Sequence, residues 1–554
     1  MPITTPVPQD SLQQCAESIG TRYGAGREKD TPFSLYFVAV LGYVLRCKYG
    51  ISRLINPILG VRTHQSLSPA YLKNAEAEIA AELDSGEASP ETRQRVRFLS
   101  SFRTEATADF FNNITLMFQS FPTIYRDLWN GKSVTCATTG KSLDAVDAIS
   151  AYFVDAYASP LIPMARAITG ESVPIISFLP VHASYILHLH GPEEMGGHGD
   201  LGAKIDAEAV RSGVTTKEIG DKLFYHTEGK VNRVPGLPPM YDWEHFPQKI
   251  ENDMPVSDFL RLAYSGFEAC DALLSLSAYD FEPESMEALK MWYAKQWGKE
   301  LYAVGPLVAS RPTKYGISSN NDSISSDIEH FLDEALHQYG EKSLVLLSFG
   351  SIFWPSKSEY VEEVVEALIE KKFPFIVSYA SPYAKLSDAL INKVNASGIG
   401  IISKWIPQKF ILDHQATGWF ITHAGQSGVL ESLDSGVPMI CWPFKFDQSP
   451  ASAYLSECLQ AAFELVEVRT GESGMKPMFR HGRKPQGTLE AVGAEIREVL
   501  DACRGEKGSV LRRNAEDMKL KFSKSWGPDG HSRRNFDDFL RKFELNLHES
   551  TLAL

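Results

Sequence analysis

The C-terminal half of the chain alternates short apolar runs with longer amphipathic stretches. The apolar runs cover residues 344–347, 375–378, 398–402, 419–422 and 439–442, and a polar turn and a helical pattern follow each of them. In residues 359–371, apolar side chains recur at the spacing of one helix face. Strands that alternate with helices in this way are typical of a parallel, doubly wound sheet.

The N-terminal half shows the same alternation less clearly. Residues 33–45 form an apolar run at the place of a first strand, residues 147–155 predict a helix end running into a buried strand that stops at Asp155, and residues 173–178 predict another strand. Residues 196–230 predict a long loop with a helix, and the three prolines of residues 234–240 predict a rigid turn.

The length of 554 residues exceeds what one hydrophobic core serves and predicts two domains. We expect residues 1–30 to be disordered because they are rich in Pro, Gln, Ser and Gly. The predicted division is a first lobe over 31–305, a linker over 306–327 that is rich in Ser and Asn, a second lobe over 328–510 and a C-terminal segment over 511–554. The predicted fold class is α/β, with two doubly wound, Rossmann-like lobes, and it leaves open whether the N-terminal lobe has its first strand.

The formal net charge of −14 argues against nonspecific binding to nucleic acid and to anionic membranes. The seven cysteines are dispersed and include no Cys-x-x-Cys pair, which indicates a reducing compartment. The longest apolar run is too short to span a bilayer. These features together predict a cytoplasmic protein without stable membrane insertion.

The densest group of candidate functional residues begins at the end of the run 419–422. His423 follows this run directly, and Gly425 precedes a predicted helix that starts near Gln426. Ligands of doubly wound sheets bind at the carboxyl ends of the strands, and the free N–H groups of a helix amino end favour phosphate. We therefore predict that His423, Gly425 and Ser427 bind a diphosphate, with the histidine neutralising negative charge on the leaving group.

Other residues near the carboxyl ends of these strands can bind the remaining parts of a nucleotide-sugar. Glu431 lies eight residues after His423, two helical turns on, where its carboxylate can accept hydrogen bonds from a ribose diol. Trp405 can stack on uracil and Gln408, one turn later, can reach the ribose or base.

Two further motifs follow strand ends. Asp447 and Gln448 offer acceptors and donors to hexose hydroxyls, and Ser351, in Ser348-Phe-Gly-Ser, is a candidate phosphate contact. No Asp-x-Asp pair and no metal-ligand spacing occur in the sequence, so we expect neither a metal nor a cofactor other than the UDP-sugar donor.

The residues from Trp405 to Gln448 resemble the signature of the UDP-dependent glycosyltransferases that modify small lipophilic molecules. The spacings agree: 18 residues from Trp405 to His423, 8 to Glu431 and 16 to Asp447. The sequences Val304-Gly-Pro-Leu307 and Phe281-Glu282-Pro283 also agree. The resemblance is specific over residues 265–450 and is strongest to fungal members.

This resemblance implies the GT-B fold, with two lobes that face a cleft, the donor on the C-terminal lobe and the acceptor on the N-terminal lobe. It implies a C-terminal helix, over residues 531–545, that packs back on the first lobe. Trp405 is then the uracil platform, Glu431 the ribose ligand, and Asp447 and Gln448 the sugar ligands, with glucose suggested by Gln448. The sequence Gln426-Ser427-Gly428 replaces the Trp-Asn-Ser of plant members.

The resemblance also implies a histidine that acts as general base, but this sequence has no histidine at the position where the family has it. The family uses a histidine after the first N-terminal strand, oriented by an Asp that Asp155 matches, but residues 33–45 are followed by Arg46-Cys-Lys-Tyr. The first histidine, His64, is interpreted as a surface loop residue. Three explanations are open: an incorrectly predicted N-terminal exon, a donor-binding protein without transferase activity, or another base.

The candidates for another base are the histidines of one short segment, His182, His188 and His190. The predicted function is therefore inverting transfer of a hexose from a UDP-sugar to a hydroxyl or carboxyl of a small lipophilic acceptor. The alternative is an inactive or truncated UDP-sugar-binding protein. A nicotinamide-dependent oxidoreductase is disfavoured because neither lobe contains the Gly-x-Gly-x-x-Gly turn.

Overall fold

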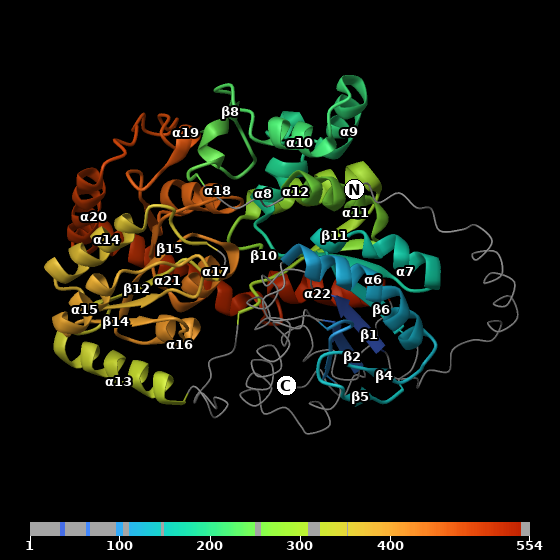
Figure 1. The fold of residues 1–554 in the computed structure, drawn as a ribbon, viewed down its shortest axis with the longest axis horizontal. Helices are drawn as coiled ribbons and strands as arrows, with labels where there is room; N and C mark the ends of the chain where they lie inside the picture. The colour runs from blue at the N-terminus through green and yellow to red at the C-terminus, as the bar shows by residue number, and fades with distance from the viewer. Residues whose placement is uncertain are drawn as a thin grey trace, which may run out of the picture.

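Two parallel sheets, each covered by helices, form the two lobes of the molecule (Figure 1). The computed structural model describes residues 96–103, 110–145, 149–249, 256–308, 322–351 and 353–543, together with the strand backbones of 34–38 and 62–66. The predictions for residues 1–30 and for most of the linker over 306–327 lie outside this part of the chain. The doubly wound α/β architecture agrees with the predicted fold class.

The N-terminal sheet has seven parallel strands in the order β11-β10-β7-β6-β1-β2-β3. The strands are β1 (Ser34–Val38), β2 (Arg62–Ser66), β3 (Val96–Leu99), β6 (Ile149–Asp155), β7 (Ile175–Leu179), β10 (Ala272–Ala278) and β11 (Glu300–Gly305). β1 lies between β6 and β2, so the lobe contains the first strand that the sequence left in question. The interpretation of His64 as a loop residue is wrong, because it lies in β2 opposite Tyr36.

The helices of this lobe are α6 (Phe110–Trp129), α7 (Leu161–Thr169), α8 (Ala183–His190), α9 (Leu201–Ser212), α10 (Thr216–Phe224), α11 (Val256–Ala269) and α12 (Pro283–Trp297). Residues 196–230 were predicted as a loop with one helix, but they form both α9 and α10. Asp200 and Thr215 cap their amino ends by accepting hydrogen bonds from backbone N–H groups. Only Ile205, Ile219 and a few other apolar side chains of these helices are buried, which explains the weak periodicity of the segment.

The C-terminal sheet has six parallel strands in the order β14-β13-β12-β15-β16-β17. They are β12 (Leu344–Ser348), β13 (Phe375–Ser378), β14 (Gly400–Ser403), β15 (Thr417–Thr422), β16 (Met439–Cys441) and β17 (Ala462–Glu464). Alternate side chains of β12 enter two different cores: Val345 and Leu347 pack on one face of the sheet, Leu344 and Leu346 on the other. A strand buried on both faces needs apolar residues at every position, which is why these strands read as continuous apolar runs.

The helices around this sheet are α13 (Asp322–Tyr339), α14 (Ser358–Glu370), α15 (Asp388–Ser397), α16 (Gln408–Asp413), α17 (Gln426–Ser435), α18 (Gln448–Ala453), α19 (Gly471–Gly474) and α20 (Leu489–Cys503). The predicted helix over 359–371 matches α14, with Val361, Val364 and Leu368 fully buried. The predicted linker extends too far, because α13 already begins at Asp322.

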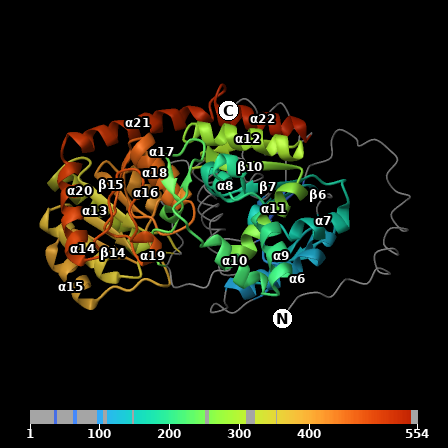
Figure 2. The same ribbon diagram turned by 90° about the horizontal axis from the view of Figure 1, so that it is seen from above.

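The chain ends with two helices that run from one lobe to the other, α21 (Glu506–Ser525) and α22 (His531–Lys542), drawn in red in Figure 2. α21 packs against α17 of the C-terminal lobe, so the predicted segment boundary at 511 falls inside this helix. α22 packs against β11 of the N-terminal lobe. The Phe539 ring lies 5.5 Å from that of Tyr302 and 5.9 Å from that of Phe153, between centroids. Among the described helices, none is both long enough and apolar enough to cross a bilayer.

Phe539 is completely buried and links the C-terminal helix to the first lobe. We expect Phe539→Ala to reduce the free energy of unfolding by about 3–5 kcal/mol, because it leaves a cavity between α22 and the sheet. Urea unfolding measures the change. Leu520→Ala is the matched control, since Leu520 on α21 is 60% exposed and its loss should change stability by less than about 0.5 kcal/mol. Equal losses in the two variants would contradict the docking of α22.

Candidate functional site

The turn between β15 and α17 brings a histidine to the amino end of a helix. His423 directly follows β15, Ala424 has a positive φ of 63° and Gly425 is the N-cap of α17. A Cβ atom at Gly425 would lie 2.5 Å from His423 Nε2, so a larger residue would displace the imidazole. The first N–H groups of α17 lie beside this nearly buried ring. The helix amino end and the ring together suit an anion such as a diphosphate.

Trp405, Gln408 and Glu431 form a second group beside the first. Trp405 lies two residues after β14, and its side chain is 39% exposed. Gln408 begins α16 and donates a hydrogen bond from Nε2 to Glu431 Oε2 at 2.7 Å. Glu431 lies on α17, so this bond joins α16 to the helix that follows His423. An exposed indole, three residues before the glutamine that holds this carboxylate, suits a flat base followed by a diol.

Asp447 and Gln448 begin α18 and are completely buried. Gln448 Oε1 accepts hydrogen bonds from the N–H groups of Phe444 (2.9 Å) and Lys445 (3.1 Å). The side-chain oxygen of Gln448 is therefore occupied by hydrogen bonds within its own loop. The Nε2 amide group can donate hydrogen bonds to a ligand. Burial raises the pKa of Asp447 to about 7. The charge of Glu282 contributes to this rise, whereas the hydrogen bond from the backbone N–H of Gln426 lowers the pKa.

Ser351 lies at the same edge of the sheet, beyond the end of β12, and its side chain is exposed. Ser348 at the end of β12 is opposite Thr422 of β15, so the turn with Ser351 is next to the turn with His423. Gly350 has a φ of 76°, which glycine adopts without strain. The four strand ends after β14, β12, β15 and β16 thus carry all nine predicted donor residues of this lobe.

The N-terminal lobe contributes a second set of polar side chains to the same region. Asp155 ends β6, is fully buried and accepts a hydrogen bond from the N–H of Tyr157 at 3.0 Å. Burial raises the pKa of Tyr157, and the charges of Asp155 and Asp447 raise it further. Tyr157 is therefore near carboxylates of both lobes. His182, the residue before α8, has its Nε2 4.0 Å from Asp447 Oδ2.

The other two candidate histidines of this segment lie elsewhere. The His188 ring stacks on His245 at 3.7 Å between centroids with an 8° angle between planes. His190 meets Phe267 edge-on at 5.1 Å. The structure therefore brings only His182 of these three next to Asp447.

Residues 241–249 join the lobes, and the sequence reasoning assigned them no role. Glu244, on the short 3-10 helix η4 (Asp242–His245), accepts hydrogen bonds through Oε1 from the N–H groups of Tyr241 (2.9 Å) and Phe479 (2.8 Å). Its backbone carbonyl accepts a hydrogen bond from Ser449, the residue after Gln448. Gln248 donates to the carbonyl of Val468 at 2.9 Å. Phe479, Ser449 and Val468 lie more than 200 positions away in the chain, so no local pattern could have revealed these contacts.

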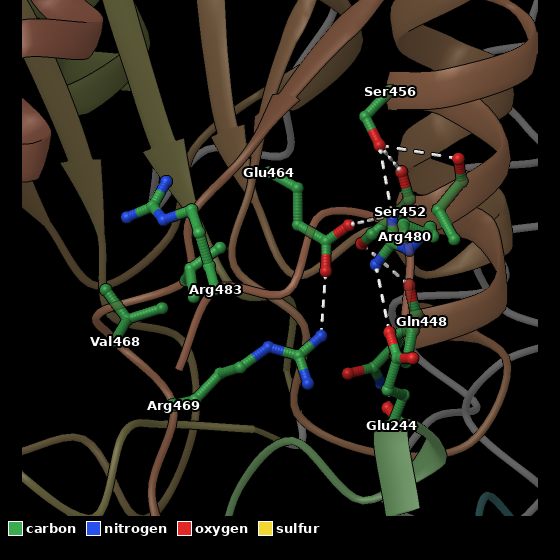
Figure 3. A network of polar contacts seen from close by, with 12 residues as sticks. Glu244, Gln448, Ser452, Ser456, Glu464, Val468, Arg469, Arg480 and Arg483 are labelled. Atoms are coloured by element: carbon green, nitrogen blue, oxygen red, sulfur yellow. Dashed lines mark hydrogen bonds and ion pairs between the residues drawn. The ribbon is translucent and has the colours of Figure 1, made fainter. Parts of the chain in front are cut away.

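A buried network of four charges continues from Glu244 into the C-terminal lobe (Figure 3). Arg480 lies 3.5 Å from Glu244 Oε2 and 2.8 Å from Glu464 Oε2, and Arg469 lies 2.8 Å from Glu464 Oε1. Burial alone would raise the pKa of Glu464, but the two arginines outweigh it and hold the pKa at about 2. The negative charges of two buried carboxylates are thus neutralised by the positive charges of two buried guanidinium groups.

Within the described residues, no group of three His, Cys, Asp or Glu side chains has an arrangement that could hold a metal ion. The groups at this site that suit phosphate are His423, the N–H groups at the start of α17 and the hydroxyl of Ser427. The expectation that no metal or further cofactor takes part remains a prediction.

The sequence resembles known sugar transferases over much of its length. Residues 283–473 match the family model described as UDP-glucoronosyl and UDP-glucosyl transferase. The UDP-glycosyltransferase eriJ of Hericium erinaceus is 33% identical over 330 residues, which are 58% of this chain and 65% of that protein. UDP-glucosyltransferase 45 of Panax ginseng is 28% identical over 45% of this chain and 52% of that protein. The chain thus matches less than two thirds of the length of these relatives.

Solved structures resemble the whole fold. A transferase from Siraitia grosvenorii in complex with UDP superposes with a TM-score of 0.65 and 18% identity, covering 92% of this chain and all of that one. UGT71G1 of Medicago truncatula, complexed with UDP-glucose, gives a TM-score of 0.62 at 16% identity, covering 92% and 98% of the two chains. At these identities the likeness establishes the GT-B fold alone.

Arg480 neutralises carboxylates of both lobes. We expect Arg480→Met, which keeps an apolar stem, to reduce the free energy of unfolding by about 3–5 kcal/mol, because it leaves Glu244 without a counter-charge inside the protein. Urea unfolding measures this. Lys393→Met is the control: its ion pair with Glu366 is half exposed, and its loss should cost less than about 1 kcal/mol. Similar costs in the two variants would show that the buried network does not stabilise the lobe contact.

Proposed function

We propose that this chain, which is similar to the UDP-glucuronosyl and UDP-glucosyl transferases, transfers a hexose from a UDP-sugar to a small lipophilic acceptor. The reaction is inversion at the anomeric carbon, the hexose is glucose, and the acceptor group is a hydroxyl or a carboxyl. The observation that carries the proposal is the gathering of Trp405, His423, Glu431 and Asp447 at one edge of the C-terminal sheet.

The donor side of the proposal assigns one part of the UDP-sugar to each group of residues. Uracil stacks on the exposed face of Trp405, and the ribose diol donates to Glu431, which Gln408 holds in place. The diphosphate lies at His423 and the amino end of α17, where partial positive charge stabilises it as negative charge grows on the leaving UDP. Ser351 and Ser427 add hydroxyl donors.

The sugar itself is proposed to meet Asp447 and Gln448. Relatives include both glucosyl transferases and a glucuronosyltransferase, of Bellis perennis, so family membership leaves the hexose open. Gln448 carries no charge that would pair with a hexuronate carboxylate, and its free Nε2 suits a neutral hydroxyl, which supports glucose.

The acceptor side rests on the N-terminal lobe, where Asp155 ends a central strand and faces the donor region. An acceptor hydroxyl must lose a proton as it attacks the anomeric carbon, and a carboxylate at this place can assist that loss. The names of relatives support aromatic hydroxyl acceptors: one is an anthocyanidin 3-O-glucosyltransferase of Zea mays, and a Polygonum tinctorium enzyme glucosylates indoxyl.

We expect Trp405→Ala and Glu431→Ala each to weaken UDP binding by about 1–3 kcal/mol, through loss of a stacked base or of ribose hydrogen bonds. Isothermal titration calorimetry with UDP measures the affinity. Tyr339→Ala provides the control, because Tyr339 has the same exposure of 39% but ends α13 just ahead of β12, at the opposite edge of the sheet. Unchanged affinity in both site variants would show that UDP binds elsewhere.

A measurement of turnover distinguishes a transferase from a protein that only binds the UDP-sugar. We expect the protein to release UDP from UDP-glucose only when a phenolic or aliphatic alcohol acceptor is present, and to prefer UDP-glucose to UDP-glucuronate. Coupled UDP detection with product mass spectrometry measures both. UDP binding without release for any acceptor would instead identify a donor-binding protein without transferase activity.

A further inference from the structure

His182 stands at the end of the strand next to that of Asp155. β6 and β7 pair in parallel with Asp155 opposite Phe178, so both strands end at the same edge of the sheet. His182 follows the end of β7 by three residues and precedes the first turn of α8. Side chains that follow neighbouring parallel strands at this edge meet the same ligand.

The imidazole of His182 is completely buried, yet neither ring nitrogen has a hydrogen-bond partner among the described residues. Buried polar atoms in proteins are nearly always hydrogen-bonded, and an unpaired one costs free energy. Exceptions call for an explanation, and a function in ligand binding or catalysis is one. The Phe281 ring lies 5.3 Å away between centroids and provides an apolar neighbour on one side of the imidazole.

Two buried carboxylates stand on opposite sides of this ring. Nδ1 lies 3.9 Å from Glu282 Oε1, and Nε2 lies 4.0 Å from Asp447 Oδ2. Both distances are too long for hydrogen bonds but short enough for strong electrostatic interaction. One carboxylate belongs to the N-terminal lobe and the other to the C-terminal lobe.

Glu282 is held rigidly. Its Oε1 accepts hydrogen bonds from the N–H of Ala183 (2.6 Å) and the hydroxyl of Ser277 (2.5 Å), and its Oε2 accepts one from the N–H of Ser184 (3.0 Å). It therefore fixes the first turn of α8 and faces Nδ1 of the residue before that turn. A carboxylate beside Nδ1 favours the tautomer with hydrogen on Nδ1, which leaves the lone pair of Nε2 directed toward the other lobe.

We propose that His182 is the general base of the transfer proposed above, with Glu282 as its positioning residue, and that it replaces the histidine absent from the family position. The inference rests on the proposed function. Nε2 takes the proton of the acceptor hydroxyl, while that oxygen forms a bond to the anomeric carbon. The bond from this carbon to the β-phosphate oxygen breaks, and its electron pair leaves with UDP. The imidazolium then returns its proton to solvent as the products leave.

The charge environment is compatible with this cycle. Burial lowers the pKa of His182 to about 3, so the ring is neutral at physiological pH and able to accept a proton. A bound diphosphate would add negative charge nearby and raise this pKa toward the reaction pH. Imidazolium formed during transfer would lie between Glu282 and Asp447, and the ionised form of either side chain would stabilise it.

The test compares two acceptors that differ in their need for a base. An aliphatic alcohol must lose its proton during attack, whereas 4-nitrophenol at pH 8 is already ionised. For His182→Gln we expect transfer to the alcohol to fall by about 100- to 10,000-fold. Transfer to nitrophenolate should fall less than about tenfold, since a general base contributes nothing to an ionised acceptor. UDP affinity should stay within about twofold of the unmutated protein.

His190→Gln is the matched control, because His190 is equally buried, has neither ring nitrogen hydrogen-bonded in the described structure and lies two turns further along α8. We expect it to retain both activities. As a second variant, His182→Ala should regain alcohol transfer at least about tenfold when free imidazole is added, which a purely structural role would not produce.

If His182→Gln lowers transfer to both acceptors equally, or lowers neither, His182 is not the general base. The proposal that the protein is a transferase would still stand. Failure of imidazole to restore transfer in a folded, UDP-binding His182→Ala protein would also overturn the role of His182. If the unmutated protein transfers to neither acceptor, the proposed function itself fails, and this outcome is visible before any variant is made.

Discussion

The contact between the two lobes depends on one carboxylate that is removed from water. A buried charge is stable only when its oxygens are hydrogen-bonded and an opposite charge is near. Glu244 of the N-terminal lobe meets both needs, but the N–H of Phe479 and the guanidinium of Arg480 that satisfy it belong to the C-terminal lobe. Parting the lobes would leave this charge unpaired. The same contact places Ser449, and with it the start of α18, against the carbonyl of Glu244.

The candidate site follows from this contact because its parts come from both lobes. The C-terminal lobe brings the helix amino end at His423 and the carboxylate of Asp447, whereas the N-terminal lobe brings Asp155 and His182. The donor side has hydrogen-bond donors for phosphate, and the acceptor side has carboxylates around a neutral imidazole. An anion and an ionising hydroxyl need these opposite environments, so the different groups that the two lobes contribute match the chemistry proposed for this site.

Strand positions in the C-terminal lobe were well predicted because these strands are buried on both faces. Leu344, Leu346, Val345 and Leu347 alternate between two cores, so each position is apolar and the run stands out. Other elements were predicted poorly for equally physical reasons. α9 and α10 bury only a few side chains, and their caps at Asp200 and Thr215 are common in loops as well.

The sequence by itself predicted which residues gather at the candidate donor side, since Trp405, His423, Glu431 and Asp447 follow the ends of strands that lie parallel in one sheet. It also limited the alternative bases to His182, His188 and His190 but offered no means of choosing among them. Only the tertiary structure distinguishes these three histidines, because it places His182 near Asp447 and packs the other two against His245 and Phe267. Long-range packing, which leaves no periodic trace in a sequence, decides which buried polar group faces a ligand and which is part of the core.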